Sequence, residues 1–143
     1  MIVQEIMTRN VECVRPDATL QEAARKMRDL DVGPMPVCGP DGKLAGMVTD
    51  RDITVRATAD GKDPKACKVR DAMTPDVVYV FEDQDTGEAV RQMRDRQIRR
   101  LLVLNRDRKL SGIVSLGDLS VDADKGQAGD VLKDVSEPAE PRR

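Results

Sequence analysis

The sequence contains no histidine, and its only aromatic residues are Tyr79 and Phe81. Without histidine, the chain lacks the side chain that most often serves as a general base or a metal ligand near neutral pH. With two aromatic side chains, it cannot build the usual stacking platform for single-stranded nucleic acid. These absences argue against most hydrolytic and metal-dependent enzymes and against a nucleic-acid partner.

Cysteine is also scarce: Cys13, Cys38 and Cys67 are odd in number and irregularly spaced. An odd count argues against a disulfide framework, and the absence of a Cys-x-x-Cys pair leaves a zinc site without support. We therefore expect three reduced and mostly buried thiols. A P-loop and a Gly-x-Gly-x-x-Gly fingerprint are absent too. The sequence predicts no catalytic residue, no metal and no enzyme activity.

No apolar run approaches the roughly 18–20 residues that cross a bilayer. The first ten residues, MIVQEIMTRN, lack the basic flank and apolar core of a signal peptide. The formal net charge is only −2, although 35% of the residues are charged, which suits a soluble protein without a polyanionic partner. We expect a cytoplasmic protein that binds neither a membrane nor a nucleic acid.

The chain repeats itself. A shift of 66 residues aligns residues 3–53 with residues 69–119 without a gap, and about 19 of the 51 aligned positions are identical. Gly46 falls on Gly112 and Asp52 falls on Asp118. Chance does not preserve a register over this length, so the chain consists of two homologous halves.

Each half predicts the order strand, helix, strand, strand, helix. Thr19 and Glu22 form a capping-box pattern, and apolar residues then recur at helical spacing as far as Leu30. Asp85 and Glu88 are the counterparts of this box. In the first half, the predicted strands lie near 11–14, at 35–38 and at 44–48, and the predicted helices follow residues 19 and 49. In the second half, the strands lie near 77–80, at 101–104 and at 110–114, and the helices follow residues 85 and 115.

We place the first motif at residues 1–60, a linker at 61–72 and the second motif at 73–122. Asp60-Gly61 and Asp63-Pro64 are stop signals for the helix that precedes this linker. Residues 123–143 form a polar C-terminal tail that ends in SEPAEPRR, with a short helix predicted at residues 129–135.

The repeated Thr49-x-x-Asp52 and Ser115-x-x-Asp118 patterns allow two interpretations. In the first, the hydroxyl caps a helix, which contributes about 1 kcal/mol. The aspartate then complements the helix dipole by about 0.3–1 kcal/mol. This interpretation requires nothing beyond local stability.

In the second interpretation, the same residues bind a nucleotide. A helix N-terminus with a hydroxyl at its mouth suits a phosphate, and an ionised aspartate accepts from the two hydroxyls of a ribose. Gly46 and Gly112, three residues before each hydroxyl, leave room for a ligand near the backbone. Both interpretations stay open on the spacing alone.

Met7-Thr8 and Met73-Thr74 open the two halves. Together with the apolar strand, the Gly-x-x-Thr/Ser-x-x-Asp motif and the following helix, they make the chain resemble a CBS domain pair, or Bateman module, over roughly residues 1–120. The resemblance implies an α+β fold of two tandem β-α-β-β-α CBS motifs packed about a pseudo-two-fold axis. It also implies a disc-like homodimer and an adenosine-containing ligand (AMP, ADP, ATP, S-adenosylmethionine or NAD(H)) without a required cofactor.

The resemblance further implies roles for particular residues. Asp52 and Asp118 would accept from ribose hydroxyls, while Thr49 and Ser115 would meet phosphate or ribose. A site in such pairs often combines the motif of one half with the opening segment of the other half. Asp118 would therefore work with residues near Thr8 and Val11, and Asp52 with residues near Thr74 and Val77.

The two halves differ in charge. Arg99 and Arg100 match a basic pair that is frequent in the family, and Arg100 would reach phosphate oxygens. The first half has an uncharged Val32-Gly33-Pro34-Met35 there, and Arg51 inside its motif is the candidate compensation. We expect the second motif to take phosphate-bearing ligands.

The second half also contains an arginine-rich run, which consists of Arg91, Arg94, Arg96, Arg99 and Arg100. We interpret this run as a solvated, ion-paired helix face rather than as a nucleic-acid surface.

These observations favour a regulatory adenine-nucleotide-binding module that senses its ligand and modulates an effector protein. The alternative is a structural dimerisation or scaffolding module that binds no nucleotide and uses its motifs only as helix caps.

Overall fold

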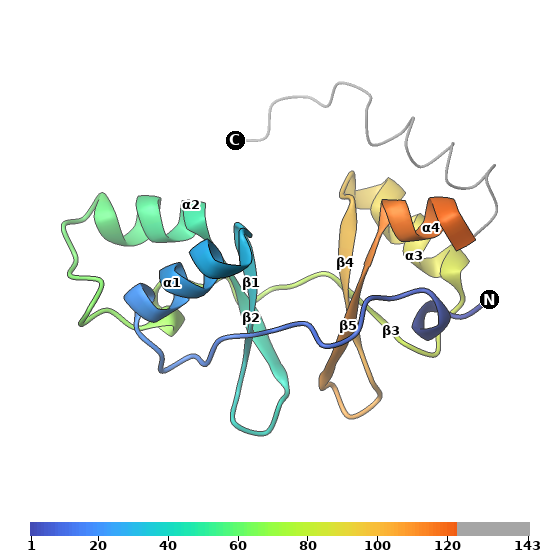
Figure 1. Ribbon diagram of the computed structural model, residues 1–143, viewed down its shortest axis with the longest axis horizontal. Helices are drawn as coiled ribbons and strands as arrows, with labels where there is room; N and C mark the ends of the chain where they lie inside the picture. Colours follow the sequence, from blue (N-terminus) through green and yellow to red (C-terminus); the bar gives the residue numbers. More distant parts are fainter. Residues whose placement is uncertain (123–143) are drawn as a thin grey trace. The chain divides into compact units, whose positions relative to one another are not determined.

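The computed structural model describes residues 1–122, which form two compact units (Figure 1). The first-motif unit consists of Glu12–Val77 with Asp107–Leu110, and the described part of the second-motif unit consists of Met1–Val11, Val78–Arg106 and residues 111–122. The first eleven residues therefore belong with the second motif rather than with the first. The polar tail and its predicted helix at residues 129–135 lie outside the described residues.

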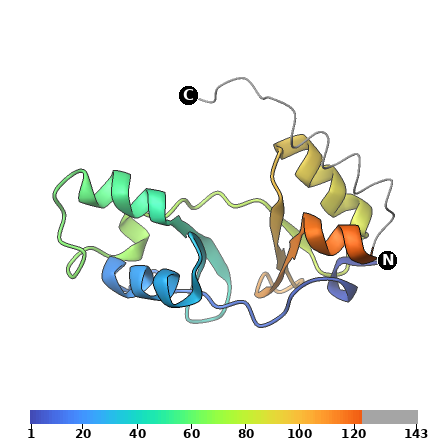
Figure 2. The ribbon, with the colours of Figure 1, turned by 45° about the horizontal axis from the view of Figure 1, so that its top comes forward.

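In the first-motif unit, α1 (Leu20–Leu30) precedes a hairpin of β1 (Pro34–Cys38) and β2 (Leu44–Thr49). The two strands pair antiparallel, and α2 (Asp50–Ile53) continues directly into a π-helical turn, η2 (Thr54–Thr58). Both α1 and α2 lie on the same side of the hairpin (Figures 1 and 2). A short 3₁₀ helix, η3 (Val69–Asp71), completes the unit.

The strand predicted near residues 11–14 is wrong in extent. Only Val14 pairs there, as a single parallel bridge to Val37 held by two backbone hydrogen bonds of 2.9 Å. Pro16 follows two residues later and has no N–H to extend the ladder.

The second-motif unit begins with a 3₁₀ helix, η1 (Val3–Glu5). Its sheet has the order β3-β4-β5, with β3 parallel to β4, and its two longer helices lie on the same side of that sheet (Figures 1 and 2). The strand predicted near residues 77–80 is present, displaced slightly toward the C-terminus. The elements are β3 (Tyr79–Phe81), α3 (Thr86–Arg96), β4 (Arg100–Leu104), β5 (Leu110–Ser115) and α4 (Leu116–Asp122).

The capping box predicted at the start of α1 is confirmed. Thr19 Oγ1 accepts from the Glu22 N–H at 3.2 Å, and the Glu22 carboxylate accepts from the Thr19 N–H at 3.1 Å. At the start of α3 the predicted box is wrong: Asp85 caps the helix by accepting from Gly87 N–H. The Glu88 carboxylate is instead held by the Arg91 guanidinium at 2.7 Å, one turn along the helix.

Each unit has its own apolar core. In the first-motif unit, Val69 and Ala72 are buried beside Leu20 and Val48, so residues inside the predicted linker at 61–72 contribute to the core. In the second-motif unit, the buried side chains of η1 and the residues after it pack with α3, β4 and α4; these N-terminal side chains are Val3, Ile6 and Met7. Residues from the predicted linker therefore complete the core of the first-motif unit, and the N-terminal residues complete the core of the second-motif unit.

None of the helices in the described part of the chain is long and apolar enough to span a membrane.

Candidate functional site

In the first motif, β2 ends at Thr49 and α2 begins at the next residue. Thr49 Oγ1 accepts from the Asp52 N–H at 3.0 Å, and Asp52 Oδ2 accepts from the Thr49 N–H at 3.0 Å. The two side chains therefore form a capping box, and the predicted cap is confirmed. The box uses one carboxylate oxygen of Asp52 and leaves the other, Oδ1, outside it.

The second motif repeats this geometry at the start of α4. The Ser115 N–H donates to Asp118 Oδ2 at 2.9 Å, and the Asp118 N–H donates to Ser115 Oγ at 3.1 Å. Both aspartates are half-buried. Capping and ligand binding do not exclude each other here, because an ionised carboxylate offers about four acceptor positions and the cap occupies one of them.

A separate chain segment lies beside each motif. Thr8 exchanges two backbone hydrogen bonds with Ile113, at 2.8 and 3.0 Å, and Thr74 exchanges two with Met47, at 2.8 and 2.9 Å. The structure thus brings Thr8 to the second motif and Thr74 to the first. Val11 and Val77 are half-buried and end the same two segments.

The close approach of these segments explains both glycines. A Cβ atom on Gly46 would lie 2.6 Å from the Thr74 carbonyl oxygen, and one on Gly112 would lie 2.6 Å from the Thr8 carbonyl oxygen. Real Cβ atoms do not approach a carbonyl oxygen this closely. Chain packing therefore accounts for the glycines by itself, without a ligand near the backbone.

In each motif, the residue just before β1 or β4 forms a backbone hydrogen bond with the first residue of the motif's helix. The Leu116 N–H at the start of α4 donates to the Arg99 carbonyl at 2.8 Å, and the Asp50 N–H donates to the Gly33 carbonyl at 3.0 Å. Arg99 and Arg100 are both exposed, and the backbone of Arg99 contacts the start of α4 through this hydrogen bond. The first motif has no basic residue at the matching positions.

The sequence analysis missed one residue that contacts the first motif, Arg56. Arg56 Nε lies 3.8 Å from Asp52 Oδ1, whereas Arg51, the expected source of charge, is exposed and has no ion pair with Asp52 among the described residues. The signal was present in the sequence as an Asp-x-x-x-Arg spacing on one helix face.

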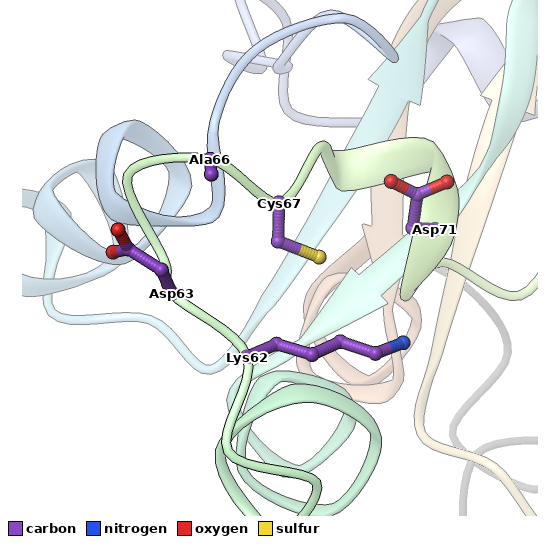
Figure 3. A pocket seen from close by; sticks show the side chains of 5 residues that line it. All are labelled: Lys62, Asp63, Ala66, Cys67 and Asp71. Atoms are coloured by element: carbon purple, nitrogen blue, oxygen red, sulfur yellow. The ribbon is translucent and has the colours of Figure 1, made fainter.

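A hollow of about 510 Å³ lies in the first-motif unit (Figure 3). Lys62, Cys67 and Asp71 line it, and the Cys67 thiol points toward the space between the other two side chains (Figure 3). The Cys67 thiol is weakly held by the Lys68 carbonyl at 3.9 Å. None of the residues predicted to bind a ligand lines this hollow.

The cysteines fit the expectation of reduced thiols, although only Cys38 is fully buried. Burial, together with the neighbouring Cys13 thiol, raises the pKa of Cys38 to about 12. A thiol with such a pKa is protonated and unreactive near neutral pH. Within residues 1–122, no three His, Cys, Asp or Glu side chains gather in a cluster that could hold a metal ion.

Several known proteins are similar to this chain. YlbB of Bacillus subtilis is 41% identical over 137 residues, which cover 94% of this chain and 91% of YlbB. The crystal structure of hypoxic response protein I with two coordinated zinc ions has a TM-score of 0.75 and 35% identity, and the match covers 85% of this chain and 98% of that chain.

Two further solved structures contain adenosine ligands. CBSX2 in complex with AMP has a TM-score of 0.70 and 26% identity, over 92% of this chain and 98% of that chain. A CBS domain pair in complex with 5′-methylthioadenosine and S-adenosyl-L-methionine has a TM-score of 0.68 and 25% identity, over 85% and 98%. The CBS domain family matches this chain twice, at residues 3–57 and 69–121. The chain therefore belongs to the CBS domain family and carries two CBS domains in tandem.

Proposed function

We propose that this protein is a regulatory module that binds an adenosine-containing ligand at its Thr/Ser-x-x-Asp motifs and modulates an effector protein. The observation that carries the proposal is the second carboxylate oxygen of Asp118. Asp118 Oδ2 is used by the capping box, while Oδ1 stays outside it, at the start of a helix whose Leu116 N–H donates to the Arg99 carbonyl. Oδ1 is therefore an acceptor for a ribose hydroxyl, and the exposed Arg99 and Arg100 of the same unit are the candidate cations for a phosphate.

The relatives support this ligand class, because two solved CBS-pair structures hold AMP or S-adenosylmethionine with 5′-methylthioadenosine. The same second motif also carries the basic pair. We infer that AMP, ADP or ATP binds first at Ser115 and Asp118, with Thr8 and Val11 beside them, and that Thr49, Asp52, Thr74 and Val77 form the corresponding site of the first motif.

We further propose that the protein works in the cytoplasm as a homodimer and that it is not an enzyme. In this proposal the module acts on an effector protein, whose activity changes when the ligand binds. A light-scattering mass near twice 15.8 kDa is the expected result for the homodimer.

Asp118→Asn tests the ligand site without removing the helix cap. The asparagine carbonyl can still accept from the Ser115 N–H, but the charge and one ribose acceptor are lost. A hydrogen bond to a charged group contributes about 1.5–3 kcal/mol, so we expect the dissociation constant for AMP to rise at least about tenfold in isothermal titration calorimetry.

The matched control is Asp83→Asn, which removes the same charge from the exposed loop after β3, where Asp83 pairs with Arg106. We expect this variant to bind AMP as the unmodified protein does. Equal affinity in Asp118→Asn and the unmodified protein would contradict the assigned role and favour a scaffold whose motifs serve only as helix caps.

A further inference from the structure

Asp52 and Asp118 occupy equivalent positions but have different neighbours. Asp52 Oδ2 accepts from the Thr49 N–H, and its other oxygen, Oδ1, faces the Arg56 guanidinium at 3.8 Å. Both carboxylate oxygens of the first motif are thus engaged within the chain. The Asp52 side chain is 16% exposed and that of Arg56 is 49% exposed, so this pair lies at the edge of the candidate site.

The Arg56 guanidinium also forms hydrogen bonds with the backbone. Its Nη1 donates to the Ala72 carbonyl at 3.2 Å and to the Met73 carbonyl at 3.3 Å. These two carbonyls directly precede Thr74, the residue that pairs with the first motif. Arg56 therefore ties the carboxylate of the motif to the segment that lies beside it.

Arg56 lies four residues after Asp52, so the two side chains fall on the same face of the helix. Arg56 lies within the π-helical turn η2, which directly follows α2. π-Helical turns of this kind are frequent at functional sites.

The second motif lacks this arrangement. The position 66 residues after Arg56 is Asp122, an acidic residue. Among the described residues, no cation lies within ion-pairing distance of Asp118, which accepts only from the Ser115 N–H.

We infer that Arg56 is a specificity-determining residue that makes the two ligand sites unequal, an inference that rests on the proposed adenosine-binding function. A ribose diol donates two hydrogen bonds to the aspartate. At Asp118 it meets a carboxylate that has no ion-pair partner within residues 1–122. At Asp52 it competes with a guanidinium that is already held by two carbonyls. The second motif is the high-affinity adenosine site, and Arg56 keeps the affinity of the first motif low.

The test weakens the second motif so that binding at the first motif contributes more to the measurement. In the Asp118→Asn protein, adding Arg56→Gln keeps a polar side chain near the Ala72 and Met73 carbonyls but removes the charge from Asp52. Since a half-exposed ion pair contributes at most about 1 kcal/mol, we expect AMP to bind this double variant about two- to fivefold more tightly than Asp118→Asn alone in isothermal titration calorimetry. Arg25→Gln, which removes an exposed arginine of α1, is the matched control and leaves the affinity unchanged.

The outcomes separate this inference from the proposed function. If AMP, ATP and S-adenosylmethionine all fail to bind the unmodified protein, the proposed function is contradicted. If the unmodified protein binds and Asp118→Asn weakens that binding, the function stands. An unchanged or weaker affinity on adding Arg56→Gln, with a melting temperature like that of the Arg25→Gln control, then overturns the inference about Arg56.

Discussion

Replacing Gly112 with alanine destabilises the protein by about 2–3 kcal/mol, because the new methyl group has no space. Its Cβ would lie 2.6 Å from the Thr8 carbonyl oxygen and 2.8 Å from Met7 Sδ. The methionine side chain can move, but the carbonyl belongs to a backbone that exchanges two hydrogen bonds with Ile113. Relief of the clash therefore separates the N-terminal segment from β5 and opens the core that Val3 helps to fill.

Gly117→Ala is the matched control for this prediction. A Cβ on Gly117 would lie 3.5 Å from Ser115 Oγ, which is an ordinary contact, and alanine is favoured over glycine inside a helix by about 1 kcal/mol. Urea unfolding followed by circular dichroism should therefore give a lower midpoint for Gly112→Ala and an unchanged or higher midpoint for Gly117→Ala. Equal midpoints in the two variants would show that Thr8 is not packed against Gly112.

Replacing Leu20 with alanine costs about 2–5 kcal/mol, the range for a leucine removed from a well-packed core. Leu20 is fully buried and packs in the cluster that contains Val37, Val48 and Val69. Its loss leaves a cavity at the point where α1 meets the residues that complete the first-motif unit. The Leu20 N–H also donates to the Cys67 carbonyl at 3.0 Å, so the surrounding backbone is held and cannot readily collapse into the cavity.

Leu30→Ala, at the other end of the same helix, provides the comparison. Leu30 is 41% exposed, and substitutions at such surface positions change stability by about 0.5 kcal/mol or less. Both changes replace leucine with alanine in α1, so helix propensity is the same in the two variants. Similar unfolding midpoints for Leu20→Ala and Leu30→Ala would contradict the core assigned to the first-motif unit.

The local elements were predictable from the sequence because their signals are local. The Thr19–Glu22 box and the apolar spacing after it mark the start and the buried face of α1. The turns Gly39-Pro40-Asp41-Gly42 and Asn105–Arg108 lie between short apolar runs and mark the hairpins. The repeat extends to the backbone: Asp31 and Gln97, 66 residues apart, both end their helices with a positive φ, of 55° and 53°.

The contacts that build the candidate site were harder to predict, because they join residues that are distant in the sequence. The pairing of Thr8 with Ile113 leaves no periodic pattern, and only the family resemblance placed Thr8 near the second motif. Arg56 was missed because its two carbonyl partners, Ala72 and Met73, are reached only once the chain has folded back. The predicted strand near residues 11–14 is shorter than expected because an apolar pattern does not show how many of its residues reach a partner strand: only Val14 pairs, with Val37.

The central claim is that the chain binds an adenosine ligand through its repeated aspartates, and a thermal-shift panel tests it most directly. The panel contains AMP, ADP, ATP, S-adenosylmethionine and NADH, with guanosine nucleotides as controls. A ligand at a hundred times its dissociation constant adds about 2.7 kcal/mol of stability, which raises the melting temperature of a chain of this size by about 5–10 °C. The account predicts such a shift with at least one adenosine ligand, reduced by about half or more in Asp118→Asn and mostly retained in Asp52→Asn. The absence of a shift with every adenosine ligand would contradict it.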